Sequence, residues 1–259
     1  PASARLPGSS PRTHRESHPD VDALRMRERS LIALMLTLLC SVPAAAQKLV
    51  PGDYVTEGGW GNLTLRQDKS GTLHFSIETV GANGHSCSLE GELRDGRAIL
   101  DALDEPCVIV MEPTAEGVDV KADREACRSY CGARAGFESF YFRPPAACAQ
   151  RTMARTRSAF QRLYDARKFA DAKSTLAPLL TQCERWLDPL TKGRIRNDLA
   201  VTLHKLGDLA GCRAVLEPLA DDAALSEDEL LELYPPFDAE SLMPILRATQ
   251  TNLKLCREK

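Results

Sequence analysis

The chain has 259 residues, with 33 Lys and Arg against 36 Asp and Glu, which gives a formal net charge of −3. No basic stripe interleaves with aromatic residues, so the sequence argues against nucleic acid as a partner. The nine cysteines are the unusual part of the composition, because such a number indicates either disulfides or a metal site.

Residues 26–46 have the pattern of a signal peptide. A short basic segment begins at Met26, an apolar run extends from Leu31 to Val42, and Ala44-Ala45-Ala46 offers a cleavage site. The apolar run has about 12 residues, fewer than the roughly 20 that a membrane-spanning helix needs. We therefore expect export to the periplasm or beyond, without a stable membrane anchor.

Residues 1–25, upstream of Met26, are expected to be a spurious extension of the start of translation or a disordered leader. Cys40 leaves a lipoprotein alternative open, although Leu39 before it is bulky for a lipoprotein cleavage site. Cleavage after Ala46 would start the mature chain at Gln47.

An even number of cysteines follows the predicted cleavage site. They are Cys87, Cys107, Cys127, Cys131, Cys148, Cys183, Cys212 and Cys256. An even count behind an export signal favours disulfides formed in an oxidising compartment. A zinc site would need paired spacings such as C-x2-C or H-x3-H, which the sequence lacks. We expect no metal and no cofactor.

Residues 47–145 show the alternation typical of strands. The expected strands lie at 61–65, 73–77, 87–93, 98–100, 107–111, 118–120 and 137–142, separated by turn residues. Short strands at regular spacing predict a small antiparallel β-barrel or sandwich, stapled by disulfides.

Pro144-Pro145 marks the expected boundary of this domain, because a double proline ends a strand. Residues 146–259 have helical periodicity, and residues 163–180 align with residues 203–220 at an offset of 40. A fixed period with helix–turn–helix content is typical of a helical repeat. The predicted fold class is α+β with two domains, a small β-barrel or sandwich followed by a short helical-repeat domain.

The helical region resembles the tetratricopeptide-repeat family. The resemblance rests on Asn197-Asp198-Leu199-Ala200, Leu203, Gly207-Asp208 and Leu216. It implies a groove for a peptide or protein partner. In that register the groove is lined by Arg157, Gln161 and Tyr164 in one unit and by Arg194, Asn197, Val201, His204 and Lys205 in the next. A solvated helix face is the alternative.

The architecture suggests a disulfide scheme. Cys148 and Cys183 lie at adjacent ends of an antiparallel helical hairpin, so we expect them to pair. Cys212 and Cys256 would then pair within the helical domain, Cys87 and Cys107 across neighbouring strands, and Cys127 with Cys131 as a tight local or labile bridge.

Three turns of the β-domain are candidate binding loops: residues 56–61, 69–71 and 80–85. Trp60 is a candidate anchor, or a residue packed over the barrel mouth. Ser70-Gly71 followed by His74 makes the β-domain resemble the periplasmic lysozyme inhibitors of Gram-negative bacteria, whose barrels insert a Ser-Gly loop into a muramidase cleft. The resemblance implies binding roles for Ser70 and His74.

The sequence lacks a G-x-S-x-G nucleophile motif and a glycine-rich phosphate loop, so we expect no enzyme. We expect a periplasmic protein that binds another protein or peptide of the envelope, as an inhibitor or immunity factor against a cell-wall hydrolase or toxin. An envelope scaffold acting through the helical groove is the alternative. An unrecognised hydrolase using Glu90 or His85 is the third hypothesis.

Overall fold

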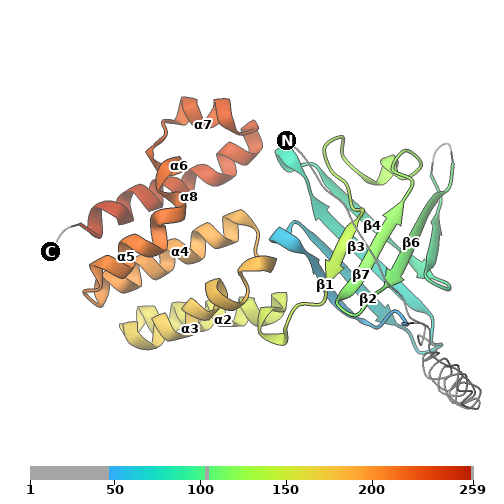
Figure 1. The fold of residues 1–259 in the computed structure, drawn as a ribbon, viewed down its shortest axis with the longest axis horizontal. Coiled ribbons are helices and arrows are strands. Elements are labelled where there is room, and N and C mark those ends of the chain that lie inside the picture. The colour runs from blue at the N-terminus through green and yellow to red at the C-terminus, as the bar shows by residue number, and fades with distance from the viewer. Residues whose placement is uncertain (1–46, 103–104, 258–259) are drawn as a thin grey trace, which may run out of the picture. The chain divides into compact units, whose positions relative to one another are not determined.

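The computed structural model describes residues 47–102 and 105–257. The predicted leader at 1–25, the predicted signal peptide at 26–46 and Cys40 therefore lie outside the described residues. Within the described part, strands come first and helices follow (Figure 1). This order confirms the predicted α+β fold class.

The strands form one antiparallel sheet with the order β4-β3-β2-β1-β8-β7-β6-β5. The strands are β1 Gly52–Thr56, β2 Gly61–Gln67, β3 Leu73–Val80, β4 Ser86–Leu93, β5 Arg97–Leu100, β6 Cys107–Pro113, β7 Gly117–Ala122 and β8 Ser139–Phe142. The two outermost strands, β4 and β5, follow each other in the chain. A tight turn joins them, in which Arg94 and Arg97 exchange backbone hydrogen bonds. The sheet therefore curls into a nearly closed barrel.

Alternation along the strands fills the barrel. Leu63 and Leu65 on β2 face inward with Phe75 and Ile77 on β3, and all four are buried. Their neighbours Asn62 and Glu78 are exposed, as period-two patterning requires. The prediction missed β1, a short strand whose Gly52 and Asp53 carry little alternating signal.

The second half contains two helical hairpins and a long final helix (Figure 1). The helices are α2 Gln150–Asp165, α3 Phe169–Gln182, α4 Pro189–Lys205, α5 Leu209–Leu216, α6 Ala220–Ala224, α7 Glu227–Leu233 and α8 Pro236–Leu255. The hairpins α2–α3 and α4–α5 repeat at the predicted offset of 40, and the long helix α8 follows them. The prediction missed the short helices α6 and α7.

All eight cysteines of the described residues are in disulfides. The predicted bridges Cys148–Cys183 and Cys212–Cys256 are confirmed. The other two predictions are wrong, because Cys87 pairs with Cys131 and Cys107 pairs with Cys127. Cys127 and Cys131 lie in a loop that crosses the barrel end, where each faces a different strand rather than the other cysteine. Among the described helices, none has the length and hydropathy to cross a membrane.

Candidate functional site

Every second connection between strands lies at the same end of the barrel, because consecutive strands of the antiparallel sheet run in opposite directions. The segments 57–60, 81–85 and 123–138 all connect strands at this end. The last of these joins β7 to β8 and is the longest connection of the β-domain. Ordered connections of this length without strands are commonly functional.

Two disulfides fix residues 123–138, here named the stapled loop. Cys127 is bonded to Cys107 at the start of β6, and Cys131 to Cys87 on β4. Residues 87 and 131 also form an isolated β-bridge, and the Gly132 N–H donates to the Ser86 carbonyl at 2.8 Å. The loop therefore partly caps the free edge of β4.

Hydrogen bonds and one buried ring hold the loop between the disulfides and β8. Phe137 is only 3% exposed in the barrel core. The Thr79 hydroxyl donates to the Gly136 carbonyl at 2.9 Å, and the Tyr130 hydroxyl donates to the Asp101 carbonyl. Gly81 lets the backbone approach closely, because a Cβ there would lie 2.1 Å from the Arg134 carbonyl oxygen. The stapled loop is thus rigidly attached at several points.

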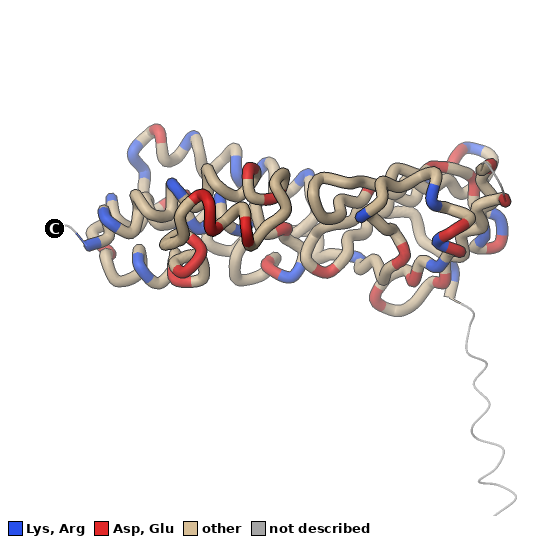
Figure 2. The backbone as a smooth tube through the Cα atoms, turned by 90° about the horizontal axis from the view of Figure 1, so that it is seen from above, with Lys and Arg blue, Asp and Glu red and all other residues tan. Residues whose placement is uncertain are grey.

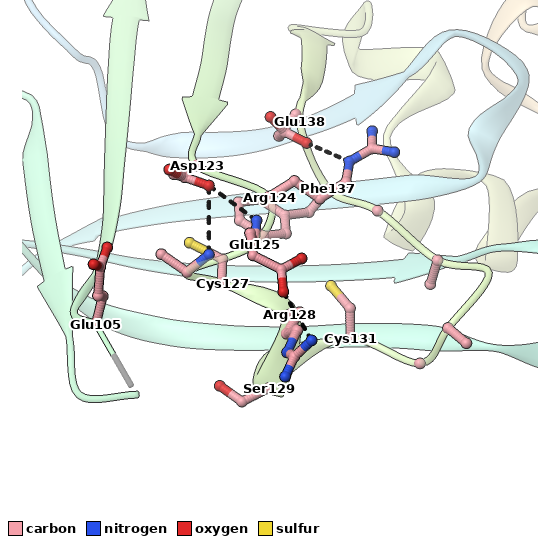
Figure 3. A pocket seen from close by; sticks show the side chains of 15 residues that line it. Glu105, Asp123, Arg124, Glu125, Cys127, Arg128, Ser129, Cys131, Phe137 and Glu138 are labelled. Atoms are coloured by element: carbon pink, nitrogen blue, oxygen red, sulfur yellow. Dashed lines mark hydrogen bonds and ion pairs between the residues drawn. The ribbon is translucent and has the colours of Figure 1, made fainter. Parts of the chain in front are cut away.

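The stapled loop surrounds a hollow of about 800 Å³ with charged walls (Figure 3). Arg124 Nε lies 3.1 Å from Glu138, and Arg128 lies 2.8 Å from Glu125. Asp123 accepts the Glu125 N–H at 2.9 Å, which shapes the start of the loop. The arginines are mostly exposed, so their donors remain available to a partner as well as to the loop.

Two of the three predicted binding loops instead hold the helical region. Asn83, in the short helix η2 Ala82–Gly84, donates its backbone N–H to Asp238 at 2.9 Å and accepts the Phe237 N–H on its side-chain oxygen at 3.0 Å. Gly59, in η1 Glu57–Gly59, lies against the backbone of residues 186–188, where a Cβ would come within 2.6 Å of the Trp186 carbonyl oxygen. These turns dock on the helices, which corrects the expectation that both are free recognition loops.

The predicted residues Ser70 and His74 meet at the opposite end of the barrel. In the β2–β3 turn, one Asp68 oxygen accepts the Ser70 hydroxyl at 2.7 Å, and the other lies 3.2 Å from His74 Nε2. These contacts lower the pKa of Asp68 from 3.8 to about 2, the Ser70 hydroxyl being the largest cause. Because Ser70 bonds to Asp68 and not to His74, the three residues lack the serine–histidine contact of a catalytic triad.

Trp60 lies directly after η1 and is 37% exposed. Its carbonyl accepts the Val80 N–H at 2.9 Å. Both its position at a loop and its partial exposure are compatible with the predicted anchor role.

The predicted groove residues of the helices differ in how exposed their side chains are. Arg194 and Lys205 are exposed on α4, and Arg157 on α2 is half-buried. Tyr164 packs against Phe169 with ring centroids 5.3 Å apart, and partial burial raises its pKa.

The prediction that Asn197 lines an open groove is corrected by the structure, because helix α8 covers this residue. Its amide donates to the Ile245 carbonyl at 3.2 Å and to Thr249 at 3.0 Å, and its oxygen accepts from Asn252 at 2.8 Å. The residue is only 8% exposed. The final helix therefore occupies this part of the predicted groove, and the Asn197 side chain is internal.

Sequence reasoning missed the stapled loop, whose signal was the placement of two cysteines within a long segment that lacks alternation. Within residues 47–102 and 105–257, no group of three or more His, Cys, Asp and Glu side chains is placed to hold a metal ion. No family model, curated protein or solved structure matches this chain. The resemblances to tetratricopeptide repeats and to lysozyme inhibitors therefore stay predictions.

Proposed function

We propose that this chain is an exported binding protein that inhibits another protein of the cell envelope, a cell-wall hydrolase or a delivered toxin. The stapled loop is the recognition surface in this proposal. Its support is the rigidity of residues 123–138, which two disulfides and the buried Phe137 attach to the barrel. A preordered loop loses little conformational entropy on binding, which favours tight association.

The charges of the loop fit a protein partner. Arg124 and Arg128 have side chains that are 80% and 67% exposed. Arg124 lies beside Glu138, which is 27% exposed, and Arg128 beside Glu125, which is 80% exposed, so each carboxylate orients a guanidinium that remains open to a partner. Arginine is enriched at protein interfaces, and such pairs favour specificity and association rate over raw affinity.

The four disulfides support the exported location of the proposal. Disulfides persist in oxidising compartments such as the periplasm and are rare in the cytosol. A small β-domain benefits from them because its hydrophobic core alone is marginal.

The experiment is a capture assay with the full chain. Tagged wild type, Arg128→Glu and Arg94→Glu would be exposed to periplasmic extract of the native host, and captured proteins assayed for peptidoglycan hydrolysis. Arg94 is the matched control, because it is also exposed and paired with a glutamate but lies at the opposite barrel end. We expect wild type and Arg94→Glu to capture and inhibit a hydrolase, with at least tenfold weaker inhibition by Arg128→Glu. Capture that Arg128→Glu does not weaken would contradict the assignment of this loop.

The alternative is a scaffold that acts through the helical region, and one observation favours it. The chain from Ala214 to Leu246 contains no Lys, Arg or His, and Asp and Glu recur along it (Figure 2). On this stretch Leu231, Leu233 and Phe237 are 48%, 62% and 54% exposed. An acidic surface with exposed apolar residues suits a basic partner. Loss of the captured partner in a Leu233→Ser variant, with retention by Arg128→Glu, would favour this function.

A further inference from the structure

The outer face of α2 carries a row of arginines. The inner face of this helix packs Phe160 and Met153 into the helical core. Arg151, Arg155 and Arg162 lie on the opposite face, and all three are exposed. They occupy positions i, i+4 and i+11 of the helix, which places them in one line on its surface. This line of three residues is named the arginine face.

The arginine face has few acidic neighbours. No Asp or Glu occurs within residues 139–164. One barrel carboxylate, that of Asp53, lies near enough to Arg151 to interact with its charge, and it is already paired with Arg66 at 2.6 Å. Among the described residues, the ion pairs of the helical region involve other cations, which are Lys173, Arg185, Arg196 and Arg247. The arginine face therefore presents a surplus of positive charge to solvent.

Helix α7 carries the opposite charge, because it lies in the acidic stretch of the helical region described above. Leu230 is its buried residue, and Asp228 and Glu232 are exposed on the face opposite to it. Two further acids of this helix are engaged, Glu227 in an ion pair and Glu229 in the cap of the helix. The carboxylates of Asp228 and Glu232 therefore face solvent.

These two charged faces lie at opposite ends of the helical layers. Helix α2 packs on α3, α3 on α4, α4 on α8, and α8 on α7 (Figure 1). Each packed helix adds about 8–10 Å between axes, so the arginine face and the acids of α7 are too far apart to pair within one chain. Both faces are available to a second copy of the chain.

We propose that the arginine face of one copy binds helix α7 of a second copy. Asp228 and Glu232 are four residues apart, as are Arg151 and Arg155. Each pair therefore has a spacing of about 6 Å along its helix. Because the spacings match, two ion pairs form at once without a change in the shape of either helix.

Apolar contact supplements the charges. Leu231 on α7 is 48% exposed and lies beside the two acids. On α2, Ala154 and Ser158 are exposed beside the arginines, and their small side chains leave room for a leucine. Burial of this leucine adds to the ion pairs, each of which contributes little free energy at an exposed site.

The contact joins two different surfaces, so it is heterologous. A pair of copies keeps one free arginine face and one free α7, and association therefore continues to an open chain or closes into a ring. Salt screens exposed ion pairs, so the association constant falls as the salt concentration rises. The contact involves neither the stapled loop nor another protein, and its failure would leave the proposed inhibition untouched.

Sedimentation velocity of the purified chain tests this contact. Two double variants each remove one side of it, Arg151→Gln/Arg155→Gln on α2 and Asp228→Asn/Glu232→Gln on α7. The matched control is Arg94→Gln/Arg97→Gln, which removes two exposed arginines from the barrel. Each protein would be measured up to about 0.5 mM, in about 50 mM and about 500 mM salt. Circular dichroism checks that every variant is folded.

We expect wild type and the control to associate in low salt and to dissociate in high salt. Each contact variant alone should associate at least about tenfold more weakly. An equimolar mixture of the two contact variants should associate again but stop at dimers, because only one intact pair of surfaces remains between them. A monomeric wild type in low salt, association that salt leaves unchanged, a contact variant that associates as wild type does, or a mixture that stays monomeric would overturn the assignment.

Discussion

Asn83 shows how one residue can join the two halves of the chain. Its backbone φ of 58° is left-handed, a conformation that Asn tolerates better than most residues. That conformation presents its N–H to Asp238 while its side-chain oxygen receives the Phe237 N–H at the start of α8. The side chain thereby satisfies a donor that a helix start otherwise leaves free. An Asn in a turn that faces solvent would look the same in the sequence, so the contact with α8 could not be predicted from the turn residues alone.

Two substitutions at this position separate the hydrogen bond from the backbone conformation. Asn83→Gly removes the side-chain bond and keeps the left-handed conformation, so we expect the free energy of unfolding to fall by about 1 kcal/mol. Asn83→Ala adds the penalty of a Cβ at positive φ, and should cost about 1 kcal/mol more. Urea denaturation measures both values.

The control for this comparison is Asn62→Ala, which truncates an exposed amide on β2. It should change the free energy of unfolding by less than about 0.5 kcal/mol. Equal stability of Asn83→Gly and wild type would show that the contact with α8 contributes nothing.

Asp68 yields a prediction about pH. Its pKa is lowered to about 2 in the folded chain by the Ser70 hydroxyl, His74 and backbone donors, against 3.8 in the absence of these contacts. A lowered folded pKa means that the contribution of the turn is present above pH 3.8 and is lost as the pH falls through about 2. Carbon NMR of the carboxyl group should give a midpoint near 2, and Ser70→Ala should move it upward. A midpoint near 3.8 in wild type would contradict the turn geometry.

At the scale of elements, the sequence predicted a disulfide correctly where both cysteines lie within one local unit, such as a helical hairpin. Cys148 and Cys183 flank one helical hairpin, so the periodicity of the helices was enough to pair them. The bonds from Cys87 to Cys131 and from Cys107 to Cys127 depend on how the stapled loop crosses the barrel end, which no periodicity encodes. Asn197 illustrates the same limit, since only the packing of α8 shows that this amide is internal.

The disulfides allow a matched test of loop rigidity. Cys87–Cys131 and Cys212–Cys256 each join residues separated by 44 positions, so the loop-closure entropy lost on removing either bridge is similar, roughly 4 kcal/mol. Only Cys87→Ala/Cys131→Ala removes one of the two bridges that hold the stapled loop. We expect trypsin to cleave this variant after Arg124 or Arg128 at least tenfold faster than Cys212→Ala/Cys256→Ala, as followed by mass spectrometry. Similar cleavage of both variants at these sites would contradict the idea that Cys131 holds the loop.

The buried amide between α4 and α8 gives a second prediction about elements. Asn197→Ala removes the partner of Asn252 and Thr249 in a buried interface, and should lower the free energy of unfolding by about 2–3 kcal/mol. Chemical denaturation checks the value, with Asn62→Ala again as control. A loss below about 0.5 kcal/mol would mean that α8 does not seal this face of α4.

At the scale of the whole molecule, the two halves have separate cores. One cluster of buried side chains fills the barrel, from Tyr54 to Tyr141, and the others lie among the helices. Each half also contains two of the disulfides. The contacts of Asn83 and Gly59 then join the halves through turns, without merging their cores.

Such a molecule depends on an oxidising compartment, which leads to a prediction about the native protein. Intact mass spectrometry of protein from its host should give a chain that begins at Gln47, with a mass about 8 Da below that of the fully reduced form, because each bridge removes two hydrogens. Treatment with a reductant should expose apolar core surface of both halves to a dye, since small domains rely on their bridges. An unprocessed N-terminus together with nine free thiols, Cys40 included, would rule out export, the stapled loop and the proposed inhibitory role at once.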